Sequence, residues 1–282
     1  MDKIIFVSDM FSKDFIGGAE LTTDAIIEKS PFDIIRVKSK DLTEDFILEN
    51  CNKKWIFGNF WFVQNNFLFQ FIKSKIIYDI IEYDYKFCDF RSPQKHEKVL
   101  GKCDCEFRSK SKLVSLFMKG ARNCWFMSED QMSFYLTKFS FLDRKKMHVL
   151  SSVFSDKTIE KILNLKCEKN DSYLIMKTNN WIKGADNAIA FAKSNNLKYH
   201  TIGQVTNDIM LEELAKSKGL IFMPNGFDTC PRITIEAKLL DCELILNDNV
   251  QHSKENWFSG SKEAMLSYIK TNCDKLWSSF ND

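Results

Sequence analysis

The sequence has little proline or histidine, no excess of charge of either sign, and no long hydrophobic run. Its 40 Lys and Arg residues stand against 38 Asp and Glu, so the formal net charge of +2 provides no general attraction to nucleic acid or to a membrane surface. No apolar stretch approaches the roughly 20 residues that span a bilayer. The first residues, MDKIIFVSD, lack the pattern of a signal peptide. The composition therefore predicts a cytoplasmic protein with no integral membrane segment and no nucleic-acid partner.

Cysteine, by contrast, is well represented. There are nine cysteines, an odd number that does not suit a disulfide scaffold, and several lie in apolar segments where thiols act as small hydrophobic groups. Four potential metal ligands, Cys88, His96, Cys103 and Cys105, fall within one short stretch. Their spacing, C-x7-H-x6-C-x-C, matches none of the usual zinc pairs. Structural thiols, with at most an adventitious disulfide, are thus favoured over the alternative of a structural zinc ion.

Short apolar runs alternate with amphipathic segments along all 282 residues, which predicts parallel βαβ units. Strands are expected at residues 3–8, 33–37, 54–58, 75–81, 124–128, 147–150, 172–177, 197–203, 220–223 and 243–246. Helices are expected between them, including an aromatic-rich one at 59–71 and a last one at 261–280. Because the alternation restarts near residue 150, we expect an α/β protein with two doubly wound domains, residues 1–152 and 153–260, followed by a C-terminal helical segment, 261–282.

The stretch from residue 220 to residue 246 carries the strongest local pattern. A buried strand is followed by the turn-rich segment Pro224–Pro231 and then by a helix from Arg232, for which Thr229 can provide the cap and Pro231 the first turn. Such a unit places backbone N–H groups and the positive end of a helix dipole at the carboxyl edge of a sheet. The stretch therefore predicts a site for an anionic ligand.

Three other junctions are compatible with a ligand but are weaker signals. Gly17-Gly18 follows the first strand and opens a helix, although a tight turn explains the pair equally well. Lys183 lies between a strand and a helix, where it can reach a phosphate, but taken alone it is a surface lysine. The polar cluster Glu82–Lys86 follows a strand and either faces a substrate or forms a charged loop.

Together these pieces resemble the retaining glycosyltransferases of the GT-B fold, especially family 4. The match is carried by Gly17-Gly18-Ala19-Glu20, by Lys183-Gly184, and by Pro224-x-Gly226-Phe227-Asp228-x7-Glu236-Ala237, which is similar to the family's E-x7-E signature. The order and separation of the pieces agree across nearly the whole chain. The resemblance implies two Rossmann-like domains facing across a cleft, with the C-terminal helix crossing back to the first domain. It also implies transfer of a sugar from a nucleoside diphosphate sugar to a hydroxyl acceptor, a glycan or a small molecule, with retention and without a metal.

The resemblance also assigns roles to residues. Glu236 would accept hydrogen bonds from the ribose hydroxyls, Asp228 would face the donor sugar, and Lys183 would neutralise the leaving group. The implied catalytic residues are Lys183, Asp228 and Asp84. The implied donor-binding residues are Gly17, Gly18, Lys177, Thr178, Lys183, Gly203, Asp228, Thr229, Cys230, Arg232 and Glu236.

The sequence departs from the family at three positions. Asp228 stands where a glutamate is usual, Thr178 stands where an arginine is usual, and no histidine obviously ends a strand of the first domain. In that place the chain has the loop that contains Asp84. These departures motivate an alternative, a catalytically silent GT-B protein that serves as a partner subunit or as a glycan- or nucleotide-binding module. A sugar-nucleotide epimerase on the same fold is a third hypothesis.

Overall fold

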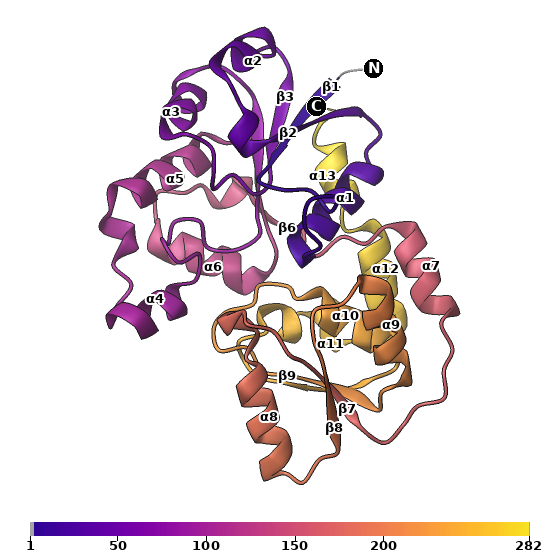
Figure 1. The fold of residues 1–282 in the computed structure, drawn as a ribbon. Helices are drawn as coiled ribbons and strands as arrows, with labels where there is room; N and C mark the ends of the chain where they lie inside the picture. The colour runs from indigo at the N-terminus through magenta and orange to yellow at the C-terminus, as the bar shows by residue number, and fades with distance from the viewer. Residues whose placement is uncertain (1–2, 282) are drawn as a thin grey trace. The chain divides into compact units, whose positions relative to one another are not determined.

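The computed structural model describes residues 3–281, which form two compact units, each built around its own parallel sheet (Figure 1). The first unit contains the chain up to Val153 together with the segment from Cys273 onward. The second unit is Phe154–Asn272. This confirms the expected α/β fold with two doubly wound domains.

The first unit contains a six-stranded sheet in the order β2-β1-β3-β4-β5-β6, in which every neighbouring pair is parallel. Its strands are β1 (Lys3–Ser8), β2 (Asp33–Lys38), β3 (Lys54–Phe57), β4 (Tyr78–Glu82), β5 (Cys124–Phe126) and β6 (Met147–Val149). Its α-helices are α1 (Gly18–Glu28), α2 (Glu44–Glu49), α3 (Asn65–Lys73), α4 (Pro93–Leu100), α5 (Ser109–Gly120), α6 (Glu129–Lys138) and α13 (Asp274–Ser278). The central strands are almost fully buried and mostly apolar because both faces of a parallel sheet are covered.

Aromatic side chains form much of the core between this sheet and α3 and α5. The ring of Phe57 lies 4.9 Å from that of Phe71 and 5.0 Å from that of Phe117, both edge to face. Tyr78 stacks on Phe117 at 4.6 Å and donates a hydrogen bond to its carbonyl oxygen. Such aromatic pairs each contribute about 0.5–1.5 kcal/mol beyond the area they bury. This packing holds α3 and α5 against β3 and β4.

The expected helix at 59–71 begins later than its aromatic pattern suggested. The carboxylate of Asp9 accepts hydrogen bonds from the backbone N–H groups of Trp61 and Phe62, at 3.1 Å each. A backbone N–H bound to a side chain from another loop does not join a helical ladder. The segment before Asn65 is therefore a loop at the carboxyl edge of the sheet.

The second unit contains a four-stranded parallel sheet in the order β10-β9-β7-β8. Its strands are β7 (Tyr173–Met176), β8 (Tyr199–Ile202), β9 (Gly219–Phe222) and β10 (Glu243–Leu246). Its α-helices are α7 (Asp156–Asn164), α8 (Ala185–Ser194), α9 (Asn207–Lys216), α10 (Arg232–Leu239), α11 (Asn256–Ser259) and α12 (Lys262–Thr271). Figure 1 shows α8 on one side of this sheet and α9 and α10 on the other.

The C-terminal segment is two helices, α12 and α13, so the expectation of one helix over 261–280 was wrong. The apolar side chains of the two helices belong to different cores, Met265 and Ile269 to the second unit and Leu276 and Trp277 to the first. In the first unit the indole Nε1 of Trp277 donates to the carbonyl oxygen of Ile26 at 3.2 Å. The chain thus returns to its first unit, as expected, but through a separate short helix.

Both sheets share one topological feature. β1 lies between β2 and β3, and β7 lies between β8 and β9. In each sheet the chain therefore first runs from this strand to a neighbour on one side and later continues with the neighbour on the other side. In open α/β folds, ligands bind beyond the carboxyl ends of the strands at such a switch point. In the second unit the loops at this point are those after β7 and after β9.

Candidate active site

The loops after β7 and β9 bring Lys183 and Asp228 together. Lys183 Nζ donates to Asp228 Oδ2 at 2.6 Å, although the two residues are 45 positions apart. The side chains are 28% and 11% exposed, so the ion pair lies at the surface of the switch point rather than in the core. The two residues that the sequence singled out for the donor sugar and the leaving group therefore share one location.

Gly184 allows this close approach. Its φ is 64°, a left-handed conformation that favours glycine, and a Cβ at this position would lie 1.8 Å from the carbonyl oxygen of Met223. The loop after β7 is thus pressed directly against the end of β9. The lysine–glycine pair has a physical basis: glycine permits the contact, and the contact sets the position of Lys183.

Asparagines that the sequence did not identify hold the two loops together. Asn225 donates from Nδ2 to the carbonyl oxygen of Trp181 at 2.7 Å and from its backbone N–H to that of Ile182 at 2.9 Å. Asn247 and Asn249, which follow β10, both donate to the carbonyl oxygen of Pro224, at 2.9 and 2.8 Å. The sequence does contain a signal for them, because each asparagine comes within three residues of the end of β9 or β10, and these two strands are neighbours in the sheet.

Helix α10 begins at Arg232, and Pro231 is its N-cap residue. The expectation that Thr229 caps this helix and that Pro231 lies in its first turn was therefore wrong. Proline at the cap has no side-chain acceptor for the N–H groups of the first turn. Thr229 and Cys230 are buried directly before the helix.

Glu236 is almost fully buried within α10. Its Oε1 accepts a hydrogen bond from Asn207 Nδ2 at 3.2 Å and lies 3.8 Å from Arg232 Nε. Burial raises the pKa of the Glu236 carboxyl, while Arg232 and Asn207 oppose the shift. The Arg232 guanidinium in turn lies over the ring of Phe154, 3.8 Å from its centroid. A carboxylate fixed in this way is well placed to accept hydrogen bonds from hydroxyl groups.

The other donor-side candidates of the second unit are more exposed. Lys177 and Thr178 directly follow β7, and the hydroxyl of Thr178 accepts a hydrogen bond from the backbone N–H of Asn180 at 3.2 Å. Gly203 follows β8, and a Cβ there would meet nothing within 4 Å. Glycine at 203 is therefore not required by packing, in contrast to Gly184.

In the first unit, Gly17 is the N-cap residue of α1 and Gly18 is its first residue. The φ of Gly17 is −134°, which any residue can adopt, but a Cβ there would lie 2.4 Å from Glu20 Oε2. Glycine thus makes room for the Glu20 carboxylate, which folds back to its own backbone N–H. Burial raises the pKa of Glu20.

Four charged side chains lie within and after the end of β4. Lys86 Nζ is 3.1 Å from Glu82 Oε1, and both side chains are at most 1% exposed. Burial raises the pKa of Glu82 to about 7, opposed by Lys86. Asp84 receives a hydrogen bond from Arg91 Nε at 2.6 Å and lies 3.5 Å from Lys86 Nζ. Asp84 is only partly buried, and Lys86 and Arg91 outweigh the effect of this burial and lower the pKa of its carboxyl.

The expected strand 75–81 stopped short of Glu82, which is the last residue of β4. The sequence also missed Gln131, which holds the loop that follows. Gln131 Nε2 donates to the carbonyl oxygen of Asp84 at 2.6 Å, and its Oε1 accepts from the backbone N–H of Met127 at 2.7 Å. The backbone at Asp84 is therefore fixed from α6.

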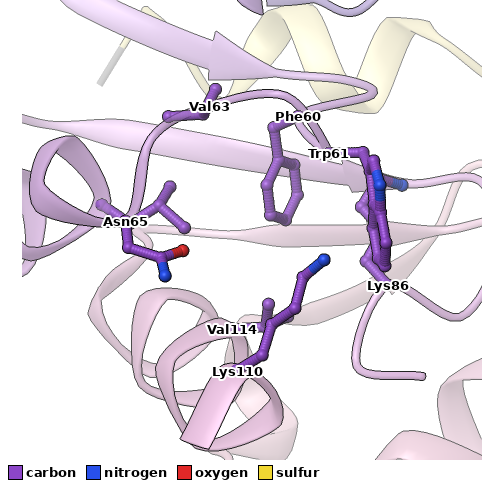
Figure 2. A pocket seen from close by; sticks show the side chains of 8 residues that line it. Phe60, Trp61, Val63, Asn65, Lys86, Lys110 and Val114 are labelled. Carbon is purple, nitrogen blue, oxygen red and sulfur yellow. The ribbon is translucent and has the colours of Figure 1, made fainter. Parts of the chain in front are cut away.

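Beside this network the first unit has a small hollow, shown in Figure 2, lined by Phe60, Trp61, Val63, Asn65, Leu68, Lys86, Lys110 and Val114. Lys110 reaches from α5 over the indole of Trp61, with Nζ 3.0 Å from the ring centroid. The free volume is about 10 Å³, the space of about one water molecule. The hollow is too small for a sugar or a nucleotide.

The cysteine-rich segment after β4 also comes together. All nine cysteines are free thiols, and one ligand atom from each of Cys88, His96, Cys103 and Cys105 lies within 4.8 Å of the others. Within residues 3–281 no helix has both the length and the apolar character needed to cross a membrane.

Comparison with known proteins gives structural matches alone. No protein-family model matches the chain, and no curated protein has a significantly similar sequence. HepE from Anabaena, in complex with UDP and glucose, matches at a TM-score of 0.59 and 11% identity over 100% of both chains. AviGT4, a glycosyltransferase involved in avilamycin A biosynthesis, matches at 0.53 and 9% identity over 98% of this chain and 93% of that one.

An α-glucosyltransferase in complex with UDP and a 13-mer DNA containing an HMU base matches at a TM-score of 0.52 and 13% identity, over 98% of this chain and 91% of that one. At such identities the likeness concerns the fold. The match to HepE extends over both parallel sheets of this chain, because it covers the full length of the sequence. The chain therefore has the GT-B fold.

Proposed function

We propose that this protein is a retaining glycosyltransferase that moves a sugar from a nucleoside diphosphate donor to a hydroxyl acceptor. The observation that supports it best is the meeting of Lys183 and Asp228 beside the start of α10, which carries Glu236. A lysine, a carboxylate and a helix N-terminus at a switch point suit a ligand that has phosphates and hydroxyls. Because the complexes of HepE and the α-glucosyltransferase contain UDP, we propose UDP as the nucleotide.

In the proposed donor complex, the Glu236 carboxylate accepts hydrogen bonds from the ribose hydroxyls. The backbone N–H groups of Thr229, Cys230 and Arg232 face the diphosphate or the sugar hydroxyls. Thr178 has no charge to offer where the family carries arginine. Two cations are proposed to take its place: Lys177, beside Thr178 in sequence, and Arg232, at the start of α10.

The proposed reaction breaks the bond between the anomeric carbon and the diphosphate oxygen while the acceptor oxygen bonds to the same face of that carbon. The acceptor's proton passes to the departing phosphate oxygen, so that atoms and charges balance without a metal. Lys183 Nζ neutralises the charge that develops on the leaving group, and its position comes from Asp228. Preorganised charge of this kind ordinarily accounts for about 10²–10³ in rate per group.

On the acceptor side we propose that Asp84 orients the hydroxyl. Lys86 and Arg91 lower the pKa of Asp84, and a carboxylate with a lowered pKa is a weak base. Asp84 is therefore proposed to accept a hydrogen bond from the acceptor rather than to remove its proton. This agrees with a mechanism in which the leaving phosphate takes the proton.

Isothermal titration with UDP tests the donor site. We expect Glu236→Ala and Lys183→Ala each to weaken binding about 10- to 100-fold, because a hydrogen bond to a charged group contributes about 1.5–3 kcal/mol. Matched controls are Glu212→Ala and Lys198→Ala, which remove exposed charges of the same unit and should leave the affinity unchanged. Wild-type affinity in both site variants would overturn the assignment.

Turnover tests the activity itself. The protein is incubated with a panel of UDP-sugars and hydroxyl acceptors, and the anomeric configuration of the product is read by NMR. We expect a product with the configuration of the donor and no loss of rate in EDTA. Binding of UDP without turnover on any acceptor would instead favour a catalytically silent protein.

A further inference from the structure

The segment between β4 and α5 gathers three thiols and one imidazole from separate local structures. Cys88 lies in the loop after β4, His96 in α4, Cys103 just after α4, and Cys105 in the short 3-10 helix Cys105–Phe107. Cys88, His96 and Cys105 are fully buried, and Cys103 is half-buried. Among the described residues this is the one group of Cys, His, Asp or Glu side chains close enough to hold a metal ion together.

Two of the distances within this group match those of a tetrahedral zinc site, and the third is shorter. Zn–S bonds of about 2.3 Å and Zn–N bonds of about 2.0 Å at tetrahedral angles place two sulfurs about 3.8 Å apart, and a sulfur and a nitrogen about 3.5 Å apart. Cys88 Sγ lies 3.8 Å from Cys103 Sγ and 3.5 Å from His96 Nδ1. Cys105 Sγ lies 3.1 Å from the same nitrogen. Because all four ligand atoms lie within 4.8 Å of one another, the group fits a single ion.

Backbone N–H groups and a network of ion pairs surround the sulfur atoms. The backbone N–H of Asp89 donates to Cys105 Sγ at 3.5 Å, and the backbone N–H of Phe90 faces Cys88. Arg108 pairs with both Asp89 and Asp104, at 2.6 and 2.7 Å, and so ties together the two ends of the cysteine segment. The segment that carries three of the four candidate ligands is thus held in place by contacts of its own.

The imidazole is oriented by packing. The ring of Phe90 lies 4.8 Å from that of His96, and Nδ1 is the nitrogen that faces the sulfurs. Nε2 is buried and has no hydrogen-bond partner among residues 3–281. The ring is therefore presented to the thiols by its stacking contact and its place in α4.

A disulfide accounts less well for the group. A bond between two sulfurs requires a separation of about 2.05 Å, whereas Cys88 and Cys103 lie 3.8 Å apart. A disulfide would also leave the imidazole and the third thiol without a role. The buried cysteines elsewhere, such as Cys124 and Cys273, belong to no such group within the described residues.

We propose that Cys88, His96, Cys103 and Cys105 bind one structural zinc ion. The four ligands complete the tetrahedron, and such closed sites stabilise folds rather than catalyse reactions. The ion joins the loop after β4 to α4 and to the start of α5. That loop carries Arg91, which pairs with Asp84, so zinc holds the partner of the proposed acceptor-side carboxylate.

Elemental analysis of the full-length chain tests the proposal. The protein is produced with zinc in the medium, purified without chelators or a metal-affinity tag, and measured by inductively coupled plasma mass spectrometry. We expect about one zinc per chain, released when a mercurial reagent titrates the thiols. Replacement by Co²⁺ should give the thiolate-to-cobalt absorption and the d–d bands of a tetrahedral site.

Single substitutions identify the ligands. Cys103→Ser, at the half-buried position, and His96→Gln should lower the zinc content about tenfold or more and lower the melting temperature. Cys51→Ser and Cys167→Ser, which change exposed thiols, are the matched controls and should retain zinc. If a ligand variant does not fold, the zinc content of the wild-type protein still tests the proposal.

Three results would overturn the proposal. These are wild-type protein without zinc after incubation with excess Zn²⁺ and dialysis, a Cys88–Cys103 disulfide in peptide mass spectrometry, and iron as the bound metal. None of them bears on UDP binding in the second unit, so failure here is distinguishable from failure of the proposed function.

Discussion

Each unit gathers two acidic and two basic side chains at the carboxyl edge of a sheet, but the two groups are assembled differently. In the first unit, Glu82, Asp84, Lys86 and Arg91 lie within one short stretch of sequence. In the second, Lys183 follows β7, while Asp228, Arg232 and Glu236 follow β9. The first group is formed by the local course of the chain, and the second by the pairing of two strands.

The two groups also differ in exposure. Lys86 and Glu82 form a direct ion pair that is at most 1% exposed, whereas Lys183 is 28% exposed beside Asp228. Because Lys86 and Glu82 are enclosed and hydrogen-bonded to each other, they cannot meet a ligand without reorganisation, while a half-exposed lysine such as Lys183 can exchange its partner for a phosphate. The difference indicates that the Glu82–Lys86 pair supports the structure and that the Lys183–Asp228 pair is available for binding.

The largest expected effect comes from breaking each pair at its lysine. Lys86→Met leaves the buried Glu82 carboxylate without its counter-charge and should cost about 3–5 kcal/mol of the free energy of unfolding. The matched change Lys183→Met, at the half-exposed pair, should cost about 1 kcal/mol or less. Urea denaturation followed by circular dichroism measures both. Glu82→Gln combined with Lys86→Met should recover part of the loss, and equal losses for the two lysines would refute the distinction.

A smaller effect is expected where the two loops of the second unit touch. Gly184→Ala adds a Cβ that would meet the Met223 carbonyl oxygen in a left-handed backbone conformation. It should cost more than about 2 kcal/mol and weaken UDP binding because Lys183 moves. Gly203→Ala, where a Cβ meets nothing within 4 Å, is the control and should change stability by less than about 0.5 kcal/mol. If both variants behaved alike, the tight contact at Gly184 would be refuted.

The pH dependence of stability provides the smallest expected effect. His252 is fully buried, and burial lowers its pKa to about 3 from the ordinary 6.5. Between pH 3 and pH 6.5 this histidine is therefore protonated in the unfolded chain but neutral in the folded chain. Protonation of the unfolded chain lowers the free energy of unfolding as the pH falls from 6.5 toward 3, whereas above pH 6.5 the histidine causes no such loss. At pH 5 the loss is about 2 kcal/mol.

Denaturation curves at pH 7 and pH 5 measure this loss. His252→Leu should remove about that much of the pH dependence, although it also removes the contact between the ring and Thr234 Oγ1, at 3.2 Å. His200→Gln, at a half-exposed histidine of β8, is the control and should retain the dependence. An unchanged slope in His252→Leu would show that the buried ring is not responsible.

Local pattern predicted most of the strands because each is a short apolar run between turn residues. It was less accurate where a long-range contact overrides local preference. The loop before α3 is held open by Asp9, and the last helix is broken because its two apolar stripes serve different cores. The cap of α10 was misassigned because Thr229, although a common type of capping residue, lies two positions before the N-cap residue, Pro231.

The sequence alone determined the alternation of strands and helices, and with it the two doubly wound sheets, the places of Lys183 and Asp228 in the loops after strands, and that of Glu236 in the helix that follows. It did not determine that Lys183 contacts Asp228 or that Gly184 packs tightly against Met223. Nor did it determine that the side chains of three cysteines and one histidine come together after β4. Periodicity and propensity act over a few residues, so they specify where a strand ends. Which strand ends become neighbours depends on the order of strands in the sheet, and only the tertiary structure decides that.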